Sequence, residues 1–414
     1  MNQRPDSYRW VPSFDHVSVA EDGALPQGFR AAGVAGGIKP TGDKDVAIIV
    51  SDAPETVSAA RFTASSVIAA PVQVTQERTR LDGLRAVVAN SGNANAATGG
   101  RGLDEAARMQ GAASMVAGVP TDAVAVASTG VIGVQLDGNK VVQALVGARE
   151  ELRTDGAGDF TAAISTTDAF PKTICWDVQL SGGTVRLTGQ AKGAGMIQPG
   201  FATMLCFVQT DAALSPETAD LLFGVCVKRS FERISVDGQL STNDTAILMA
   251  SGSSGVTVEP QSEDEVRFGE ALDAALRTLA LDMVADGEGA KRIGRVVVRG
   301  DDHDDVETVA RAVANSPLVK TALFGQDPNW GRIAQTVGGA LPGRAPLALS
   351  IAIEGVTVCK KGNAIPFDLD ALTEAVGGDQ VEYVVELPGE GTETEVFFSD
   401  FGYEYVRINA EYTT

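Results

Sequence analysis

Residues 192–211, KGAGMIQPGFATMLCFVQTD, decide how this chain is organised. The glycines and the proline predict a loop over residues 192–200. The apolar run over residues 203–208 then predicts a buried strand. Thr203 therefore stands where a loop enters a strand, and on its own it is most simply a β-branched residue that begins the strand.

Thr203 also has the chemistry of a self-generated nucleophile. A threonine hydroxyl attacks a carbonyl poorly unless a base lies beside it. If the backbone were cut between Ala202 and Thr203, the new α-amino group, with a pKa of roughly 7.7 to 8.0, would supply that base. The threonine can make the cut itself by attacking the preceding carbonyl, which gives an ester that water hydrolyses. The chain has only two histidines, His16 and His303, which disfavours a histidine-based triad and agrees with this design.

The composition is that of a globular, acidic protein. The 414 residues are 44% hydrophobic and 21% charged, enough for roughly two to three domains. The formal net charge of -21 opposes binding to nucleic acid or to an anionic membrane. The four cysteines have no paired spacing and lie mostly in apolar stretches, which predicts buried thiols in a reducing compartment.

No metal site and no membrane segment is predicted. His303 lies in the acidic run DDHDD, residues 301–305, which is typical of a charged surface turn. Residues 1–22 lack the apolar core of a signal peptide, and no later apolar run reaches the ~18 residues of a membrane span. We therefore expect a soluble, cytoplasmic protein.

Alternating strand and helix patterns predict a mixed α/β fold. Strand patterns cover residues 84–89, 123–127, 173–180, 185–189, 203–208 and 296–298. Helix patterns cover residues 104–119, 140–152, 217–231, 263–286 and 305–314. The turn residues SGGT at 181–184 predict a hairpin, and residues 347–358 and 381–406 are predicted mainly as strands. We expect the second half to form a second α/β layer system against the first.

Four polar segments rich in small residues predict a binding pocket. They are NSGNAN at 90–95, STGVIG at 128–133, STTD at 165–168 and STNDT at 241–245. Each segment alone is typical of a turn whose hydroxyl and amide groups bind nearby backbone. Their number in one chain favours a pocket lined with hydrogen-bond donors.

Long motifs from about Gly28 to Thr414 resemble those of the ornithine acetyltransferase family, the glutamate N-acetyltransferases of arginine biosynthesis. These motifs are KGAGMIQPGFATML, NSGNANAATG, STGVIG, STTDAFPK, SFERISVDGQLSTNDT, DGEGAKR, NSPLVKTALFGQDPNWGRI and the terminal INAEYTT. The resemblance implies a layered α/β/β/α fold of the type found in N-terminal-nucleophile enzymes. It also implies self-cleavage between Ala202 and Thr203.

The resemblance implies a division of the chain at that bond. An N-terminal extension, residues 1–22, would precede an α chain of residues 23–202 that forms an α/β domain. A β chain of residues 203–414 would form a second α/β domain beginning with the nucleophile. The two chains would stay together and assemble as an α2β2 tetramer.

The family's site residues map onto matching positions of this sequence. Thr203 would be the nucleophile, and the Thr129 hydroxyl with the Gly130 N–H would form the oxyanion hole that acyl transfer requires. Substrate contacts would fall on Thr166 or its neighbour Thr167, and on Lys192, Thr203, Glu288, Asn409 and Thr414.

The charges of two of these residues suit an amino-acid substrate. Lys192 would hold the α-carboxylate, and Glu288 would meet a cationic side-chain amine; this assignment is our interpretation of their charges. Without the resemblance, Lys192 is simply a solvated loop lysine and Glu288 a carboxylate at a helix end.

The implied reaction is a ping-pong acetyl transfer from N2-acetylornithine to glutamate, without a metal or an organic cofactor. Some family members also accept acetyl-CoA as a co-substrate, and this sequence does not separate the two groups. Three alternatives stay open. The chain could be a related self-processing acyltransferase with another donor, an N-terminal-nucleophile amidohydrolase or aminopeptidase, or an inactive homologue.

Overall fold

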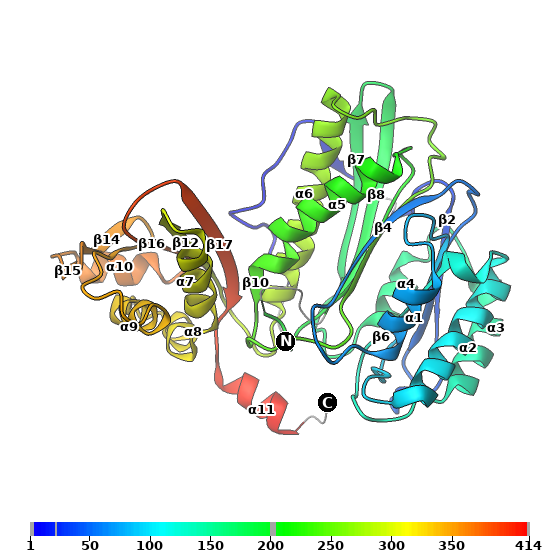
Figure 1. The fold of residues 1–414 in the computed structure, drawn as a ribbon, viewed down its shortest axis with the longest axis horizontal. Coiled ribbons are helices and arrows are strands. Elements are labelled where there is room, and N and C mark those ends of the chain that lie inside the picture. Colours follow the sequence, from blue (N-terminus) through cyan, green and yellow to red (C-terminus); the bar gives the residue numbers. More distant parts are fainter. Residues whose placement is uncertain (1–3, 21–22, 199–203, 412–414) are drawn as a thin grey trace.

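Three β-sheets organise the described residues of the computed structural model, which are 4–20, 23–198 and 204–411 (Figure 1). Two sheets stack face to face and, with their helices, form what we call the layered unit. The third sheet forms a separate C-terminal unit at the other end of the molecule. Ala202, Thr203 and Thr414 lie outside the described residues.

A six-stranded sheet forms one half of the stacked pair. Its order is β1 (Val17–Val19), β7 (Lys172–Leu180), β8 (Gly183–Lys192), β9 (Leu205–Thr210), β11 (Thr245–Ala250) and β4 (Val57–Phe62). β9 and β11 are parallel, whereas the other neighbours are antiparallel. Every residue of β9 and β11 is buried, which accounts for their largely apolar sequences. The hairpin predicted at residues 181–184 joins β7 to β8.

A four-stranded sheet forms the other half. Its order is β2 (Phe29–Val34), β3 (Val46–Ser51), β5 (Ala86–Asn90) and β6 (Val124–Ser128). β3, β5 and β6 are buried along their whole length. β5 and β6 run parallel, so both end at the same edge of the sheet, where two of the polar segments begin.

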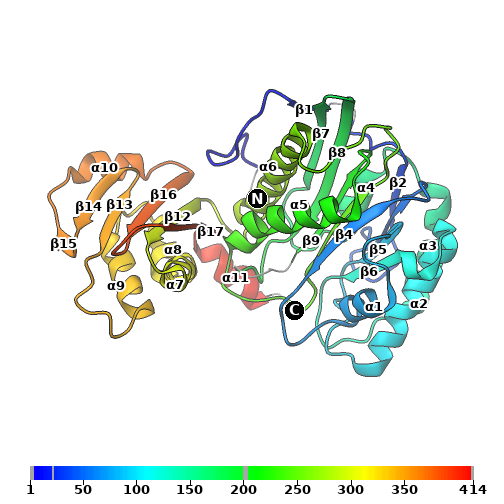
Figure 2. The same cartoon turned by 45° about the horizontal axis from the view of Figure 1, so that its top comes forward.

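Helices cover the outer faces of both sheets, and the apolar inner faces pack together. α5 (Pro216–Arg229) and α6 (Glu263–Ala285) lie on the six-stranded sheet. α1 (Ala70–Arg78), α2 (Gly99–Ala117) and α3 (Gly138–Glu151) lie on the four-stranded sheet (Figure 2). Between the sheets, Phe160 of α4 (Ala157–Ile164) meets Phe207 edge to face, with ring centroids 5.4 Å apart. The predicted α/β/β/α arrangement is confirmed.

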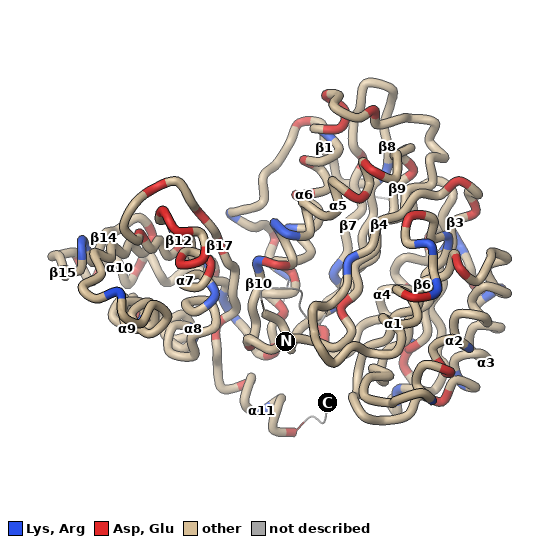
Figure 3. Tube along the Cα trace, in the orientation of Figure 1, with Lys and Arg blue, Asp and Glu red and all other residues tan. Residues whose placement is uncertain are grey.

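The C-terminal unit has its own sheet and its own core. The sheet order is β10 (Ile234–Ser235), β17 (Thr392–Ser399), β12 (Ile293–Gly300), β16 (Gln380–Glu386), β13 (Ser350–Ile353), β14 (Val356–Lys360) and β15 (Asn363–Ala364). Its helices are α7 (His303–Asn315), α8 (Pro317–Phe324), α9 (Trp330–Ala340) and α10 (Leu369–Ala375). Acidic residues are spread over both units (Figure 3).

The ranges 23–202 and 203–414 do not correspond to separate folded units. β8 and β9 lie on opposite sides of the predicted cut and pair directly, from Leu187 with Thr210 to Lys192 with Leu205. Apart from β10, the segment before residue 293 belongs to the first layer system, and the segment from β12 onward supplies the other strands of the separate unit. The expected N-terminal extension also contributes, because β1 pairs with β7.

The strand prediction for the end of residues 381–406 is wrong. β17 ends at Ser399, and the chain then forms helix α11 (Tyr403–Glu411). None of the residues of α11 is buried, so the apolar residues in this stretch do not belong to a buried strand as the sequence pattern suggested. Arg407 pairs with Glu404 and Glu411, the three- and four-residue spacings that stabilise helices.

Two smaller predictions also need correction. His303 is not in a turn; it is an exposed residue at the start of α7, where the Asp302 carboxylate accepts the N–H groups of Asp304 and Asp305 as an N-cap. Lys192 is not in the loop, because it is the last residue of β8. None of the helices in the described ranges combines the length and the apolar character needed to cross a membrane.

The contact between β2 and α4 yields a stability prediction. A Cβ atom added at Gly33 would collide with the backbone carbonyl of Asp159, which cannot move as a side-chain end can. We expect Gly33→Ala to lower the free energy of unfolding by about 1 to 3 kcal/mol, measured by urea denaturation. The matched control is Gly111→Ala in α2, where the added Cβ meets nothing within 4 Å; there we expect a gain of up to about 1 kcal/mol. Equal effects at both positions would contradict the predicted collision.

Candidate functional site

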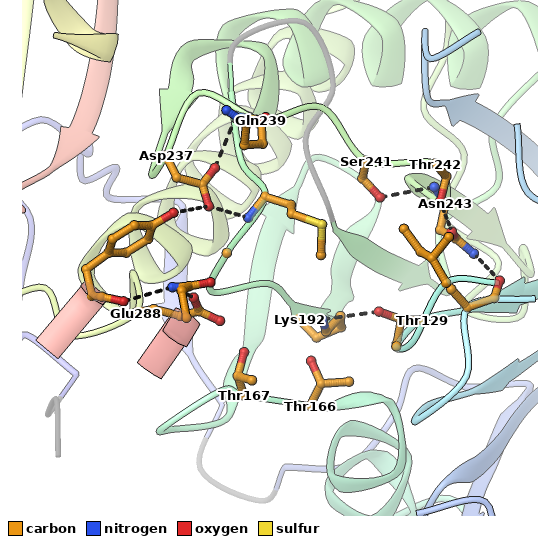
Figure 4. A pocket seen from close by; sticks show the side chains of 17 residues that line it. Thr129, Thr166, Thr167, Lys192, Asp237, Gln239, Ser241, Thr242, Asn243 and Glu288 are labelled. Atoms are coloured by element: carbon orange, nitrogen blue, oxygen red, sulfur yellow. Dashed lines mark hydrogen bonds between the residues drawn. The ribbon is translucent and has the colours of Figure 1, made fainter. Parts of the chain in front are cut away.

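The four polar segments converge on one pocket of the layered unit, as predicted (Figure 4). Its walls include Ala94 from the first segment, Thr129, Gly130 and Ile132 from the second, Thr166 and Thr167 from the third, and Ser241, Thr242 and Asn243 from the fourth. Lys192, Glu288 and Asn409 complete the set of predicted residues within the described range. The sequence motifs are therefore brought together from seven separate stretches of chain.

Thr129 and Gly130 follow β6 directly and face the pocket. The Thr129 N–H donates to the Asn90 carbonyl at 2.9 Å, which joins the ends of the two parallel strands. Gly130 has φ +132°, and a Cβ there would collide with the backbone of Gly92 and Asn93. Only glycine fits this position, so the backbone conformation directly after Thr129 requires a glycine. The predicted oxyanion hole would use the Thr129 hydroxyl and the Gly130 N–H from this turn, and that role stays a prediction.

Lys192 ends β8 and is buried, with 3% of its surface exposed. Its Nζ donates to Thr129 Oγ1 at 3.3 Å. Burial lowers the pKa of Lys192, and the nearby Asp168 charge opposes that shift. The alternative of a solvated loop lysine is wrong, because Lys192 is buried at the end of a strand. Since it lines the pocket, its ammonium is available to an anionic ligand.

Thr166 and Thr167 lie in the loop between α4 and β7 and both line the pocket. Asp168, the next residue, accepts the N–H of Thr166 and the N–H of Gly193, each at 2.9 Å. Burial would raise the pKa of Asp168, but the Lys172 and Lys192 charges outweigh it and hold that pKa well below its usual range. Asp168 is therefore an ionised residue that connects the threonine loop to the end of β8.

Glu288 and Asn409 meet at the far side of the pocket. Asn409 Nδ2, from α11, donates to Glu288 Oε2 at 2.7 Å. The Glu288 N–H donates to the Ala194 carbonyl at 3.0 Å, and the Glu288 carboxylate lies over Gly195, where a Cβ would come within 2.9 Å of Cδ. The Glu288 loop and the loop after β8 are thus packed directly on each other.

Asn243 and Asp244 tie the fourth polar segment to the others and to β9. Asn243 Nδ2 donates to the carbonyls of Ala94 at 2.7 Å and Ser128 at 2.9 Å. The Asp244 Oδ1 accepts the N–H of Met204, the first described residue after the predicted cut, at 2.9 Å. Burial raises the pKa of Asp244 to about 7, although the Met204 N–H acts in the opposite direction. The backbone just beyond the cut is held beside the pocket.

Five pocket residues were not predicted: Gly195, Met196, Asp237, Gln239 and Tyr405. Asp237 accepts the N–H groups of Met196 at 2.7 Å and Ile197 at 2.9 Å, and Tyr405 Oη donates to it at 3.4 Å. Asp237 was missed because an aspartate followed by a glycine is typical of any turn. The one signal that could have found it is its position in the SVDG run, shortly before the polar STNDT segment.

The charges of the pocket are separated. Lys192 and Thr129 lie on one side, and Glu288 and Asp237 lie toward the other (Figure 4). This distribution suits a ligand that carries a carboxylate at one end and an ammonium at the other. Thr203, Ala202 and Thr414 lie outside the described residues, so their predicted roles stay predictions.

The sequence matches the model of the ArgJ family over residues 30–414. This chain belongs to the ArgJ family. It is 44% identical over 393 residues to the arginine biosynthesis bifunctional protein ArgJ of Nitratidesulfovibrio vulgaris, covering 94% of this chain and 99% of that one. It is 42% identical over 411 residues to the protein of the same name from Rhodopirellula baltica, covering 97% and 98%.

Two solved structures are similar to this ArgJ-family member. ArgJ from Bacillus halodurans is 35% identical with a TM-score of 0.47, covering 50% of this chain and 98% of that one. The ornithine acetyltransferase of Mycobacterium tuberculosis, solved in complex with ornithine, is 33% identical with a TM-score of 0.41, covering 46% and 100%.

The opposite pKa shifts of Asp244 and Asp168, two buried aspartates beside the pocket, predict opposite pH dependences. Because folding raises the pKa of Asp244, its ionisation costs stability, and the cost grows as pH rises from about 4 to about 7. Asp244→Asn removes the charge and keeps an acceptor for the Met204 N–H. We expect this variant to melt higher than the wild type at pH 8, with a gain that shrinks toward pH 5.

The matched control for that experiment is Asp168→Asn. Because folding lowers the pKa of Asp168, its ionised form stabilises the fold above the unfolded pKa, and this contribution is lost as pH falls. We expect Asp168→Asn to melt lower than the wild type at pH 8, with the difference shrinking toward acid pH. Shifts of the same sign in both variants would contradict the assigned ionisation states.

Proposed function

We propose that this chain is a self-cleaving acetyltransferase of arginine biosynthesis that moves the acetyl group from N2-acetylornithine to glutamate. The observation that carries the proposal is the pocket in which Lys192 and the Thr129–Gly130 pair face Glu288 and Asn409, beside the backbone at Met204. Membership of the ArgJ family, whose similar members are named as bifunctional arginine biosynthesis proteins, supports it.

The proposed reaction has two half-reactions on Thr203. Its Oγ attacks the acetyl carbonyl carbon of N2-acetylornithine while the α-amino group takes the hydroxyl proton. The negative charge that develops on the carbonyl oxygen is stabilised by the Thr129 hydroxyl and the Gly130 N–H. The carbon–nitrogen bond then breaks, the proton passes to the leaving nitrogen, and ornithine departs. The glutamate amine attacks the acetyl ester in the same way and releases N-acetylglutamate.

The pocket's charged residues account for binding of both amino acids. Lys192 would hold the α-carboxylate that donor and acceptor share. The ornithine ammonium would meet Glu288, with Thr166 or Thr167 and the terminal Thr414 as further contacts. Asn409 can serve either substrate, because its amide oxygen accepts from an ammonium and its amide nitrogen donates to the glutamate side-chain carboxylate.

The transfer proposed here needs no metal and no organic cofactor, since every proton moves between Thr203 and the substrates. Acetyl-CoA would be a second acetyl donor for the same nucleophile. We further propose an α2β2 assembly and a cytoplasmic location. The net charge of -21 makes nucleic acid an unsuitable partner.

Thr203→Ala tests the nucleophile. Because the change removes the attacking hydroxyl and little volume, we expect a folded protein of full length with no acetyltransferase activity. Intact-mass measurement of the wild type after incubation with N2-acetylornithine should show a chain that begins at Thr203 and carries one acetyl group. Processing of the variant at the wild-type rate would contradict the mechanism. Acetyl release from the wild type that glutamate does not accelerate would instead indicate a hydrolase.

Thr129→Val tests the oxyanion hole. Loss of one donor is expected to lower kcat by about 100- to 1,000-fold, corresponding to about 2.7 to 4 kcal/mol. The matched control is Thr188→Val, since Thr188 is equally buried, donates to Gln209 at 2.8 Å and lies outside the pocket. There we expect only a lower melting temperature. Equal kcat in Thr129→Val and wild type would remove Thr129 from the mechanism.

A further inference from the structure

A second buried lysine, Lys172, joins the loops that form the pocket without lining it. Lys172 begins β7 and its side chain is fully buried. Its Nζ donates to Asp168 Oδ1 and to Asp286 Oδ2, both at 2.6 Å. The two carboxylates are almost as deeply buried, with side-chain exposures of 3% and 1%. We call these three residues the buried triad.

Each carboxylate of the buried triad also holds the backbone of a pocket loop. Asp168 accepts the N–H groups of Thr166 and Gly193, and so fixes the threonine loop to the end of the strand that carries Lys192. Asp286 accepts the Ala169 N–H at 2.9 Å. Asp286 is the C-cap residue of α6 and lies two residues before Glu288. The Lys172 ammonium bonds both carboxylates. It therefore adds a buried connection between the two sides of the pocket to the direct bonds of Asp286 with Ala169 and of Glu288 with Ala194.

We infer that Lys172 is a positioning residue that sets the distance between the Lys192 and Glu288 sides of the pocket, and so selects for the length of a substrate with charges at both ends. The inference deepens the proposed function and rests on it. Burying three charged groups stabilises a fold little compared with apolar packing, but it fixes geometry, because each short bond has one favourable length and direction.

The electrostatic role of Lys172 is distinct from its geometric role. One ammonium between two carboxylates leaves the triad with one net negative charge, which faces the Lys192 ammonium through Asp168. Replacing Lys172 by methionine keeps the length of the side chain but leaves two buried carboxylates facing each other. Such a variant loses both geometry and charge balance. A second substitution, Asp286→Asn, restores the net charge without restoring the connection.

The test compares steady-state kinetics and melting temperature in the full chain. For Lys172→Met we expect the KM for N2-acetylornithine to rise by about tenfold or more, as one weakened charged hydrogen bond implies. We expect kcat to change by less than about threefold, because the oxyanion pair lies outside the triad. Lys172→Met/Asp286→Asn should recover melting temperature while its KM stays raised. If Lys172→Met alone does not fold, the KM of this double variant is compared with that of the wild type instead.

The matched control is Asp282→Asn, one turn before Asp286 on α6. Asp282 is buried and accepts hydrogen bonds from Tyr8 Oη at 2.6 Å and Arg4 Nε at 3.0 Å, neither of which belongs to a pocket loop. The KM of the Asp282→Asn variant should therefore equal that of the wild type. A wild-type KM in Lys172→Met, or recovery of both stability and KM in the double variant, would overturn the inference and leave Lys172 a charge-balancing residue. Absence of acetyl transfer by the wild type would refute the proposed function instead.

Discussion

The pairing of β8 with β9 is the constraint on which the rest of the site depends. It places Lys192 directly opposite Leu205, so the ends of the two strands on either side of the predicted cut lie side by side. The pocket is built around that point, because the Asp168 carboxylate binds Gly193 on one side and the Asp244 carboxylate binds Met204 on the other. The buried core on both faces of the six-stranded sheet keeps this register, since a slip by one residue would turn every side chain to the wrong face.

Local sequence patterns predicted those features that depend on local causes. Continuous apolar runs identified the buried strands, and the polar STGVIG run was predicted to help line a pocket. The roles of Thr129 and Gly130 came only from the resemblance to the ornithine acetyltransferase family. The burial of Lys192 was missed because glycines just after it indicate a loop, whereas its strand position depends on pairing with residues beyond that loop. Helix α11 was missed because it has no buried face to impose a period on its sequence.

Long-range pairing also explains why the C-terminal unit was not recognised as separate. β12 pairs with β16 and β17, strands that lie some eighty to a hundred residues further along the chain. The buried triad has the same origin. Lys172, Asp168 and Asp286 come from a strand, a loop and a helix end, respectively. No spacing pattern in the sequence indicates the ion pair between Lys172 and Asp286, which are more than a hundred residues apart.

The position of the predicted cut inside a continuous sheet changes the molecularity of unfolding. Before the cut, β8 and β9 belong to one chain. Their separation is then unimolecular, and the covalent connection between the strands favours their pairing again. After it, the same six pairs of residues join two polypeptides, and unfolding releases two fragments that must find each other again in solution. The stability of the processed protein would therefore depend on protein concentration. Folding of the uncut chain avoids this dependence, because the two strands pair before the predicted cut separates them.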